Sequence, residues 1–418
     1  MTSLGPIFAD DLARIKPGDR LRLTISAQTS DAAALAQAAL EARARGERVL
    51  VVCADPADVP RLAQEMPWFE PKLDVRPLPD WETLPYDVLS PQEELVSERL
   101  EALYRLTAPT GGADVLLTSA VTASQRLSPV SYIGANTFFF HQGEQISLTT
   151  LQKRLAAAGY ANVKQVLAAG EFAVRGSIVD VFPMGSERPF RLDFFDDEIE
   201  SIRWFDVDTQ RSMESAEEIR LLPGHEFPVD PEALLAFRQR WRREFAGDPK
   251  KSIVYCDIEK EILPPGIEYY LPLFFDETAA LTDYLPPNAR VFLLGDIEVA
   301  LQACGRDMAS RYKVLAADPQ RPALAPERIW LKPEEFFKSL ANFARFTVEK
   351  KENAEDLKRL TGIEVDRKSQ NPVGKLLERT RESAMKGVRT LIAAPSAGRM
   401  ETMSQLLRTG GLCVEEFL

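Results

Sequence analysis

A short stretch of the chain combines arginines, carboxylates and adjacent aromatic residues in an alternating pattern. Within residues 170–213, one face of the predicted strands carries Arg175, Arg191 and Arg203 among many acids. Alternation with a period of two, bounded by glycine and proline, predicts antiparallel strands with one buried face. Successive strand residues point to opposite faces, so one residue of the pair Phe194 and Phe195 should point outward. An exposed aromatic beside arginines is typical of a protein-binding hot spot, and a solvated face with incidental ion pairs is the alternative.

The turn where a nucleotide phosphate would bind lacks the residues for that chemistry. A strand over 21–26 and a helix over 31–45 are joined by the residues in question: Ala27, Gln28, Thr29, Ser30 and Asp31. A phosphate loop needs glycines for its backbone amides and a lysine for the phosphates, and this turn has neither. Asp31 adds a carboxylate close to the place an anion would occupy. We therefore predict that ATP does not bind here and that the chain uses no cofactor.

A second acidic motif follows the predicted strand over 290–295. Asp296 and Glu298 stand where the acidic residues of a nucleotide site would be, but Asp296 is equally suited to cap the next helix, which is the interpretation we favour. The run Asp196, Asp197 and Glu198 lacks the spacing and glycine of a calcium loop, so we expect a solvated turn and no metal site.

The order of predicted elements indicates an α/β fold with an insertion. Strands and helices alternate at the start, which favours a parallel sheet with crossover helices. We expect an α/β domain over 1–135 that resumes over 217–320, and an inserted, mainly antiparallel α+β domain over 136–216. Three prolines within 319–326 predict a linker. A small α/β domain is expected over 327–418, with strands at 343–348, 389–394 and 412–417 and helices at 372–386 and 397–409.

Composition narrows the class of protein. The chain has 418 residues, 51 basic and 63 acidic, and a net charge of −12, which disfavours a protein that coats nucleic acid. Residues 345–389 carry twelve basic side chains against eight acidic ones, and their interleaving indicates a solvated helix surface rather than a DNA contact. The four cysteines form no C-x-x-C pair, no apolar run reaches eighteen residues and no signal peptide is seen, so we expect a cytoplasmic protein with no membrane contact.

Several motifs resemble one family. The run GEFAVRGSIVDVFPMGSE followed by RPFRLDFFDDEIES, residues 170–201, resembles the second domain of the bacterial transcription-repair coupling factors and, more loosely, that of the repair protein UvrB. Further matches are LPDWETLPYD at 78–87, LPGHEFP at 222–228 and LPPGIEYYLPLFF at 263–275. The resemblance covers about residues 20–321, and the remainder fits the third domain of the same family less distinctively.

The resemblance implies a fold, a partner and three site residues. It implies a helicase-like (P-loop-type) parallel-sheet domain with a degenerate nucleotide site, and an inserted domain that docks UvrA through Arg175, Arg191 and Phe195. It also implies RNA polymerase, double-stranded DNA and the protein's own C-terminal domain as partners of the full-length family protein, an ATP-dependent DNA translocase. Because the sequence stops on an apolar segment at Leu418, we expect a fragment of such a protein. Because its nucleotide motifs are degenerate, we expect the fragment to be non-catalytic. The alternative is an ATP-dependent DNA-remodelling or DNA-binding protein similar to UvrB.

Overall fold

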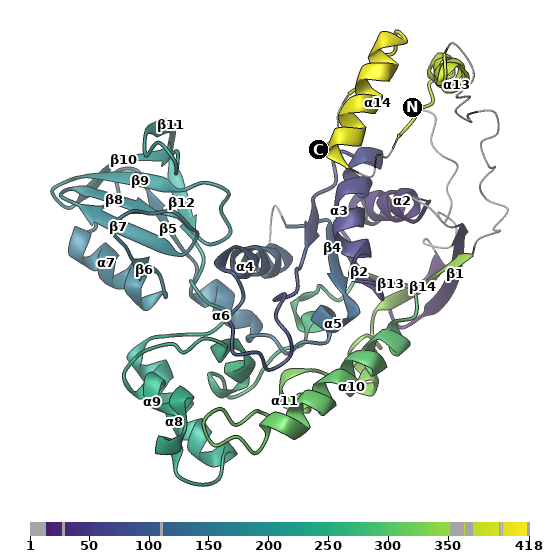
Figure 1. The fold of residues 1–418 in the computed structure, drawn as a ribbon. Helices are drawn as coiled ribbons and strands as arrows, with labels where there is room; N and C mark the ends of the chain where they lie inside the picture. Colours follow the sequence, from purple (N-terminus) through teal and green to yellow (C-terminus); the bar gives the residue numbers. More distant parts are fainter. Residues whose placement is uncertain are drawn as a thin grey trace.

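A parallel sheet and an antiparallel sheet form the two ends of the molecule (Figure 1). The computed structural model describes residues 14–26, 30–108, 112–351, 363, 371–392, 394 and 396–415. Within them, the larger domain is built on six parallel strands: β1 (Arg20–Ser26), β14 (Ala344–Lys351), β13 (Arg290–Leu294), β2 (Val49–Cys53), β4 (Val115–Ser119) and β3 (Val75–Pro77), in that spatial order. The mixed α/β class predicted from the sequence is confirmed.

Helices cover both faces of the parallel sheet. One face packs against α2 (Ser30–Ala44) and α3 (Asp58–Phe69), whose buried side chains share a core with alternate residues of the strands. The other face packs against α4 (Glu93–Thr107), α10 (Ile297–Leu315) and α12 (Pro333–Ser339). Burial on both faces explains why β2, and β13 after its first residue Arg290, are continuous apolar runs without alternation. Most alanines of α2 are buried and belong to the core that the helix shares with the sheet.

The inserted domain is a second sheet of six strands. Its spatial order is β11 (Ser212–Ala216), β10 (Glu198–Phe205), β9 (Phe190–Phe195), β8 (Ile178–Val181), β7 (Glu171–Arg175) and β6 (Ala161–Asn162). All neighbours are antiparallel except β6 and β7. The inner face packs on α7 (Leu148–Ala157), which Ser147 caps by accepting a hydrogen bond from the Thr150 amide.

The inserted region extends beyond the expected boundary at residue 216. A two-stranded antiparallel sheet joins β5 (Phe138–His141) to β12 (Glu218–Leu221), so the segments that enter and leave the insertion are paired with each other. This pairing brings residues 218–221 into the inserted unit, which the sequence pattern had placed in the α/β domain.

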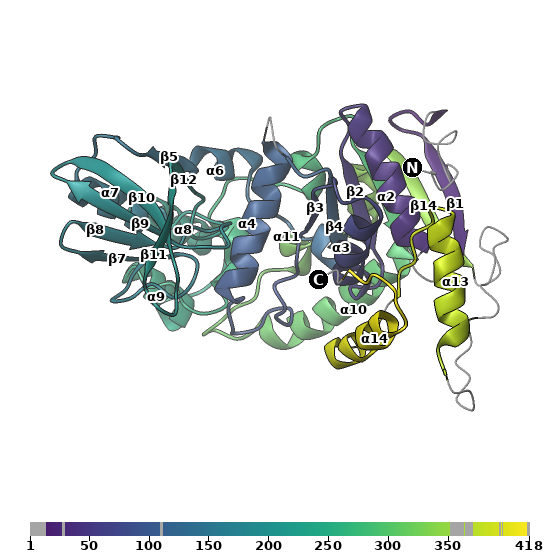
Figure 2. The ribbon, with the colours of Figure 1, turned by 90° about the horizontal axis from the view of Figure 1, so that it is seen from above.

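Helix α4 lies between the two sheets and contacts the insertion through polar side chains (Figure 2). Ser97 accepts a hydrogen bond from the Gly185 amide at 2.7 Å, and Glu101 pairs with Arg220 of β12. A side chain at Gly185 would approach a Glu101 carboxylate oxygen to 2.7 Å, and the backbone there has φ of 75°, so this close contact requires glycine.

A third core lies beneath the parallel sheet, around α8 (Pro231–Glu244), α9 (Ile253–Glu259) and α11 (Pro326–Ile329). The proline-rich segment over 319–326 packs onto this core, where Ala323 and Leu324 are buried and the Pro322 carbonyl accepts a hydrogen bond from Tyr270. The linker prediction is therefore wrong, because this segment is part of the folded domain.

The region expected to form a separate C-terminal domain is divided. β14 lies between β1 and β13 in the parallel sheet, so the boundary expected at residue 327 is wrong. The two predicted helices are observed as α13 (Gly374–Met385) and α14 (Ala397–Thr409), which pack through Leu377 and Leu407. The described residues of the strands expected at 389–394 and 412–417 form no strand. Arg389 instead donates hydrogen bonds to the carbonyls of Trp68 and Phe69 at the end of α3.

Candidate protein-binding surface

The strand register brings the three predicted site residues to one face of the inserted sheet. Asp180 on β8 pairs with Arg191 on β9, and Ile178 pairs with both Arg175 and Asp193. Because alternate residues of a strand share a face, Arg175, Arg191 and Phe195 all point away from α7. We call this side the outward face. Phe194 points inward and is buried, whereas Phe195 is 68 % exposed, which confirms that one of the two rings points outward.

Arg191 is held mainly inside the domain. Its Nε donates to Asp180 Oδ1 at 2.6 Å and its Nη2 donates to Asp180 Oδ2 at 2.9 Å. The third nitrogen, Nη1, donates to the Gln210 carbonyl at 3.1 Å and to Ser212 Oγ at 3.3 Å. The hydrogen bonds with Asp180 raise the pKa of Arg191, although burial acts to lower it. The side chain is only 15 % exposed, and its guanidinium lies over the Phe205 ring.

Arg175 is freer than Arg191. Its Nη2 donates to Asp180 Oδ2 at 2.5 Å and makes a longer contact of 3.4 Å with Gln210 Oε1. The side chain is 49 % exposed. One end of this guanidinium is therefore fixed in the sheet while the other faces solvent.

Phe195 lies at the tip of the β9–β10 hairpin. The turn at Asp196 and Asp197 places Asp196 at φ of 52°, and the turn prediction for this acidic run is confirmed. Neighbouring groups fix the turn, since the Ile146 amide donates to the Asp197 carbonyl and Gln145 donates to Glu198. A ring on an anchored turn loses little freedom when a partner covers it.

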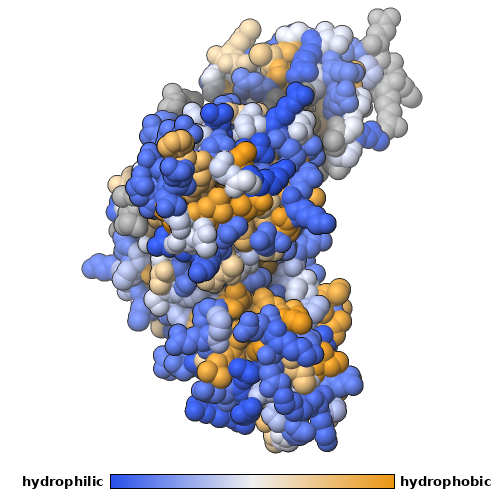
Figure 3. All heavy atoms as spheres, turned by 90° about the vertical axis from the view of Figure 1, so that its left-hand side faces the viewer, coloured by the Kyte–Doolittle hydropathy of each residue, from blue (hydrophilic) through white to orange (hydrophobic). Residues whose placement is uncertain are grey.

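The rest of the outward face is partly covered by the domain itself. A small buried cluster on this side consists of Val166, Ala173 and Phe205. Two loops lie over it, and they are joined by a hydrogen bond from the Gln210 side chain to the Val166 carbonyl. The uncovered part carries Arg175 and Phe195, together with Arg203, which lies directly opposite Arg191. Figure 3 shows that the left-hand side of Figure 1, where the inserted domain lies, is mostly hydrophilic, with separated apolar patches.

Two residues of this surface were missed in the sequence. Asp180 is fully buried beneath the arginines, and Gln210 contacts both of them. A signal for Asp180 existed, because it is the charged residue within the otherwise apolar strand β8. Gln210 lies in a loop with a left-handed φ of 58°, and the alternation of the strands gives no information about such a position.

The expected phosphate turn is described only from Ser30 onward, at the start of α2. Ala27, Gln28 and Thr29 lie outside the described residues. Asp31 is buried. Its carboxylate accepts hydrogen bonds from two nitrogens of Arg61, at 3.0 Å and 2.5 Å, and from the Ala32 amide at 2.8 Å. Burial lowers the pKa of Arg61, but hydrogen bonds and charges of Asp31 and Asp58 raise it overall. The helix start therefore carries its own carboxylate, held by an internal ion pair.

Asp296 caps α10, as favoured from the sequence. Its carboxylate accepts a hydrogen bond from the Val299 amide at 3.1 Å, and both Asp296 and Glu298 are exposed. Glu298 accepts a hydrogen bond from Gln302 one helical turn later. The two acids are therefore used in building the helix start.

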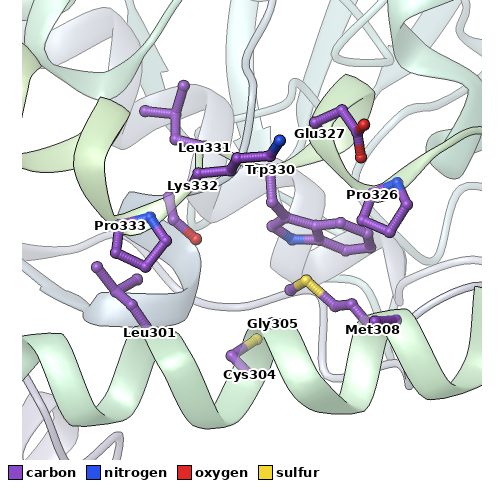
Figure 4. A pocket seen from close by; sticks show the side chains of 12 residues that line it. Leu301, Cys304, Gly305, Met308, Pro326, Glu327, Trp330, Leu331, Lys332 and Pro333 are labelled. Atoms are coloured by element: carbon purple, nitrogen blue, oxygen red, sulfur yellow. The ribbon is translucent and has the colours of Figure 1, made fainter.

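A groove of about 230 Å³ lies elsewhere, between α10 and the segment 326–333 (Figure 4). Leu301, Met308 and Trp330 give it a mainly apolar lining. Burial raises the pKa of the Cys304 thiol in this groove to about 12, so the thiol is protonated at neutral pH and is a poor nucleophile. We find no arrangement for nucleophilic chemistry among its described lining residues.

Two other kinds of feature are absent from the described part of the chain. None of its helices combines the length and apolar character needed to cross a membrane. No group of three or more His, Cys, Asp or Glu side chains there is arranged to hold a metal ion.

Comparison with known proteins agrees with the geometry of the inserted sheet. Residues 138–227 match the UvrB interaction domain, which includes β12 as well as the outward face. The transcription-repair-coupling factor of Escherichia coli is 42 % identical over 298 residues, covering 71 % of this chain and 26 % of the relative. The chain is a relative of the transcription-repair coupling factors.

Other coupling factors match larger or smaller shares of the chain. That of Haemophilus influenzae is 39 % identical over 344 residues, covering 80 % of this chain and 29 % of the relative. That of Bacillus subtilis is 32 % identical over 216 residues, covering 48 % of this chain and 18 % of the relative. This chain thus spans about a quarter of the length of the first two coupling factors.

Proposed function

We propose that this chain binds UvrA through the outward face of the inserted sheet, and so brings nucleotide excision repair to stalled RNA polymerase. The observation that carries the proposal is the placement of Arg175, Arg191 and Phe195 on one face, inside the segment that matches the UvrB interaction domain. Phe195 supplies exposed aromatic area, and Arg175 supplies a guanidinium with free donors for a partner carboxylate.

The test is UvrA affinity measured by titration calorimetry for wild type and three variants: Arg175→Ala, Arg191→Ala and Phe195→Ala. Truncating an anchor of an interface costs about 2 kcal/mol or more, so each variant is expected to bind at least about thirtyfold more weakly. Two controls are matched in side-chain type. Phe139→Ala removes an exposed aromatic of β5, and Arg154→Ala removes an exposed arginine of α7, which covers the opposite face.

The result distinguishes two failures of this proposal. Wild-type affinity in all three variants would show that a different surface is used. Failure of the wild-type chain to bind UvrA would remove the recruitment function for this chain.

Contacts of the whole protein with RNA polymerase and double-stranded DNA are part of the same proposal. They follow from the resemblance to the coupling factors. This chain spans about a quarter of the length of the E. coli relative. We assign them to no residue of this chain.

We further propose that the parallel-sheet domain is a helicase-like scaffold without ATP turnover. Two features support this: Asp31 already occupies the start of α2 with a carboxylate, and Asp296 is used as a helix cap. A P-loop protein would instead direct free backbone amides at the phosphates. In an ATPase assay with and without duplex DNA, we expect no hydrolysis above background. DNA-stimulated hydrolysis would favour the alternative, an ATP-dependent DNA-remodelling protein.

A further inference from the structure

Asp180 is a buried carboxylate at the centre of the outward face. It is the charged residue of β8, and its side chain is 0 % exposed. A buried carboxylate is strongly unfavourable unless it is paired and hydrogen-bonded, so its partners are essential to its presence. Both partners are arginines of the proposed UvrA-binding surface.

The two carboxylate oxygens are fully used by these arginines. Arg191 binds both oxygens with two parallel hydrogen bonds, the geometry that fixes a guanidinium most strongly. Arg175 shares the second oxygen, Oδ2, through a single nitrogen. Asp180 therefore determines the orientation of both guanidinium groups at once.

Gln210 completes this arrangement from the opposite side. Its carbonyl accepts a hydrogen bond from Arg191, and its side-chain oxygen contacts Arg175. Its own amide nitrogen donates to the Val207 carbonyl at 2.7 Å, which holds the side chain in place. Gln210 therefore restricts the rotation of both guanidinium groups.

The two arginines are left with different capacities for a partner. Each nitrogen of the Arg191 guanidinium has a hydrogen-bond acceptor within the domain. Arg175 uses only Nη2, and its Nε and Nη1 make no hydrogen bond with the described residues. Two guanidinium groups around one carboxylate leave a net charge of +1, which a single partner carboxylate neutralises.

We propose that Asp180 is a positioning residue for UvrA binding, which holds Arg191 in place and presents the free donors of Arg175 to a carboxylate of UvrA. This inference rests on the proposed function. A guanidinium oriented before binding loses less freedom in the complex, so its orientation contributes to affinity without Asp180 touching the partner.

The experiment measures the UvrA affinity of Asp180→Asn and of a matched control, Asp193→Asn. Asp193 of β9 points to the outward face, as Asp180 does, and its substitution by asparagine removes the same charge. It accepts a hydrogen bond from Ser201 at 2.9 Å and none from an arginine of the described residues. Loss of a charge-assisted hydrogen bond predicts at least about a tenfold weaker affinity for Asp180→Asn. Asp193→Asn is expected to bind within about twofold of wild type, because Asp193 accepts its hydrogen bond from Ser201 and orients neither arginine.

A second comparison separates positioning from a general structural effect. Asp180→Asn is also introduced into the Arg175→Ala variant, where the oriented donors are already gone. If Asp180 acts in part through Arg175, the second substitution costs less affinity in that background than it does in wild type. An equal tenfold loss in both backgrounds would overturn the proposal.

Folding of each variant is checked by circular dichroism and thermal unfolding. If Asp180→Asn does not fold, Gln210→Asn gives the decision, because asparagine tolerates the left-handed backbone and its shorter side chain withdraws from Arg175. We expect about a threefold loss of UvrA affinity in that variant. Folded variants that bind as tightly as a binding-competent wild type would overturn the positioning role alone, whereas a wild type that does not bind would also overturn the proposed function.

Discussion

Arg175 and Arg191 share a face, a charge and a carboxylate partner, yet they differ in exposure. Arg191 is 15 % exposed and Arg175 is 49 % exposed. Removing Arg191 leaves the buried Asp180 with one partner that binds through a single nitrogen. Removing Arg175 leaves the two parallel hydrogen bonds of Arg191 intact. The two residues should therefore contribute differently to stability even where both contribute to binding.

The expected result is a large loss of stability for Arg191→Ala and a small one for Arg175→Ala. Breaking a buried ion pair costs about 3 kcal/mol, whereas a half-exposed pair contributes about 1 kcal/mol or less. Urea denaturation followed by circular dichroism measures both free energies of unfolding. Arg188→Ala is the control, since Arg188 is an exposed arginine of the same domain whose ion pair with Glu214 is 3.7 Å long. Equal losses for the two variants would contradict the division of roles.

At the residue scale, alternation in the sequence was informative about the face but not about the contacts. It predicted that Phe194 and Phe195 point to opposite sides, which the burial of Phe194 confirms. It did not predict that Arg175 and Arg191 share Asp180, because that contact depends on the register between β7, β8 and β9. Register is set by pairing between strands, so the sequence of one strand alone does not reveal it.

At the scale of elements, the segment that leaves the inserted domain contains a histidine kept neutral by its surroundings. His225 stacks on Phe227 at a centroid distance of 5.4 Å, and burial lowers its pKa from 6.5 to about 4. The unfolded chain therefore binds a proton near pH 6.5 that the folded chain does not accept until near pH 4.

This difference predicts that stability falls as the pH is lowered from 7 to 5. Neutral His225 contributes to stability above pH 6.5, and this contribution is lost as the pH falls toward 4. By pH 5 the free energy of unfolding should have fallen by about 1 to 2 kcal/mol. Urea denaturation at several pH values should show a shallower dependence for His225→Asn than for wild type. His141→Asn is the control, because His141 is 58 % exposed. An unchanged dependence in His225→Asn would show that other groups cause the acid sensitivity.

Long helices and buried strands were predictable, and short or paired elements were not. The predicted helix over 31–45 and strand over 290–295 agree with α2 and β13 within about a residue at each end. β3 has only three residues, too few for a pattern to be distinguished from chance. The segment over 389–394 has an apolar strand-like sequence, but its described residues pair with no strand, and Arg389 instead caps α3.

At the scale of the whole molecule, the parallel sheet needs a strand that lies far along the chain. β1 is an edge strand whose neighbour in the sheet is β14. A buried ion pair also joins distant segments, since Arg99 of α4 binds Glu226 beyond the insertion at 2.6 Å, and Trp81 donates to the same carboxylate at 3.0 Å. The α/β domain is therefore continuous in space although the insertion interrupts it in sequence.

A chain ended at residue 326 should consequently lose cooperative folding of the α/β domain, because β1 would have no partner strand. A chain ended at residue 351 keeps β14 and is the matched control. We expect the longer chain to unfold within a few degrees of the full chain, and the shorter one to aggregate or to unfold over a broad range in a thermal scan. Equal, cooperative unfolding of the two chains would contradict the structural role of β14.

The pairing of β1 with β14 also has a consequence for how this protein is made. Leu21 leaves the ribosome long before Phe346, its partner in the sheet, has been synthesised. At the usual speed of translation, about 5 to 20 residues per second, this interval is on the order of tens of seconds. During that time the inserted sheet, whose strands are neighbours in sequence, is complete and free to fold, while the first strand emerging from the ribosome remains unpaired. The binding surface thus becomes available before the domain that carries it has closed.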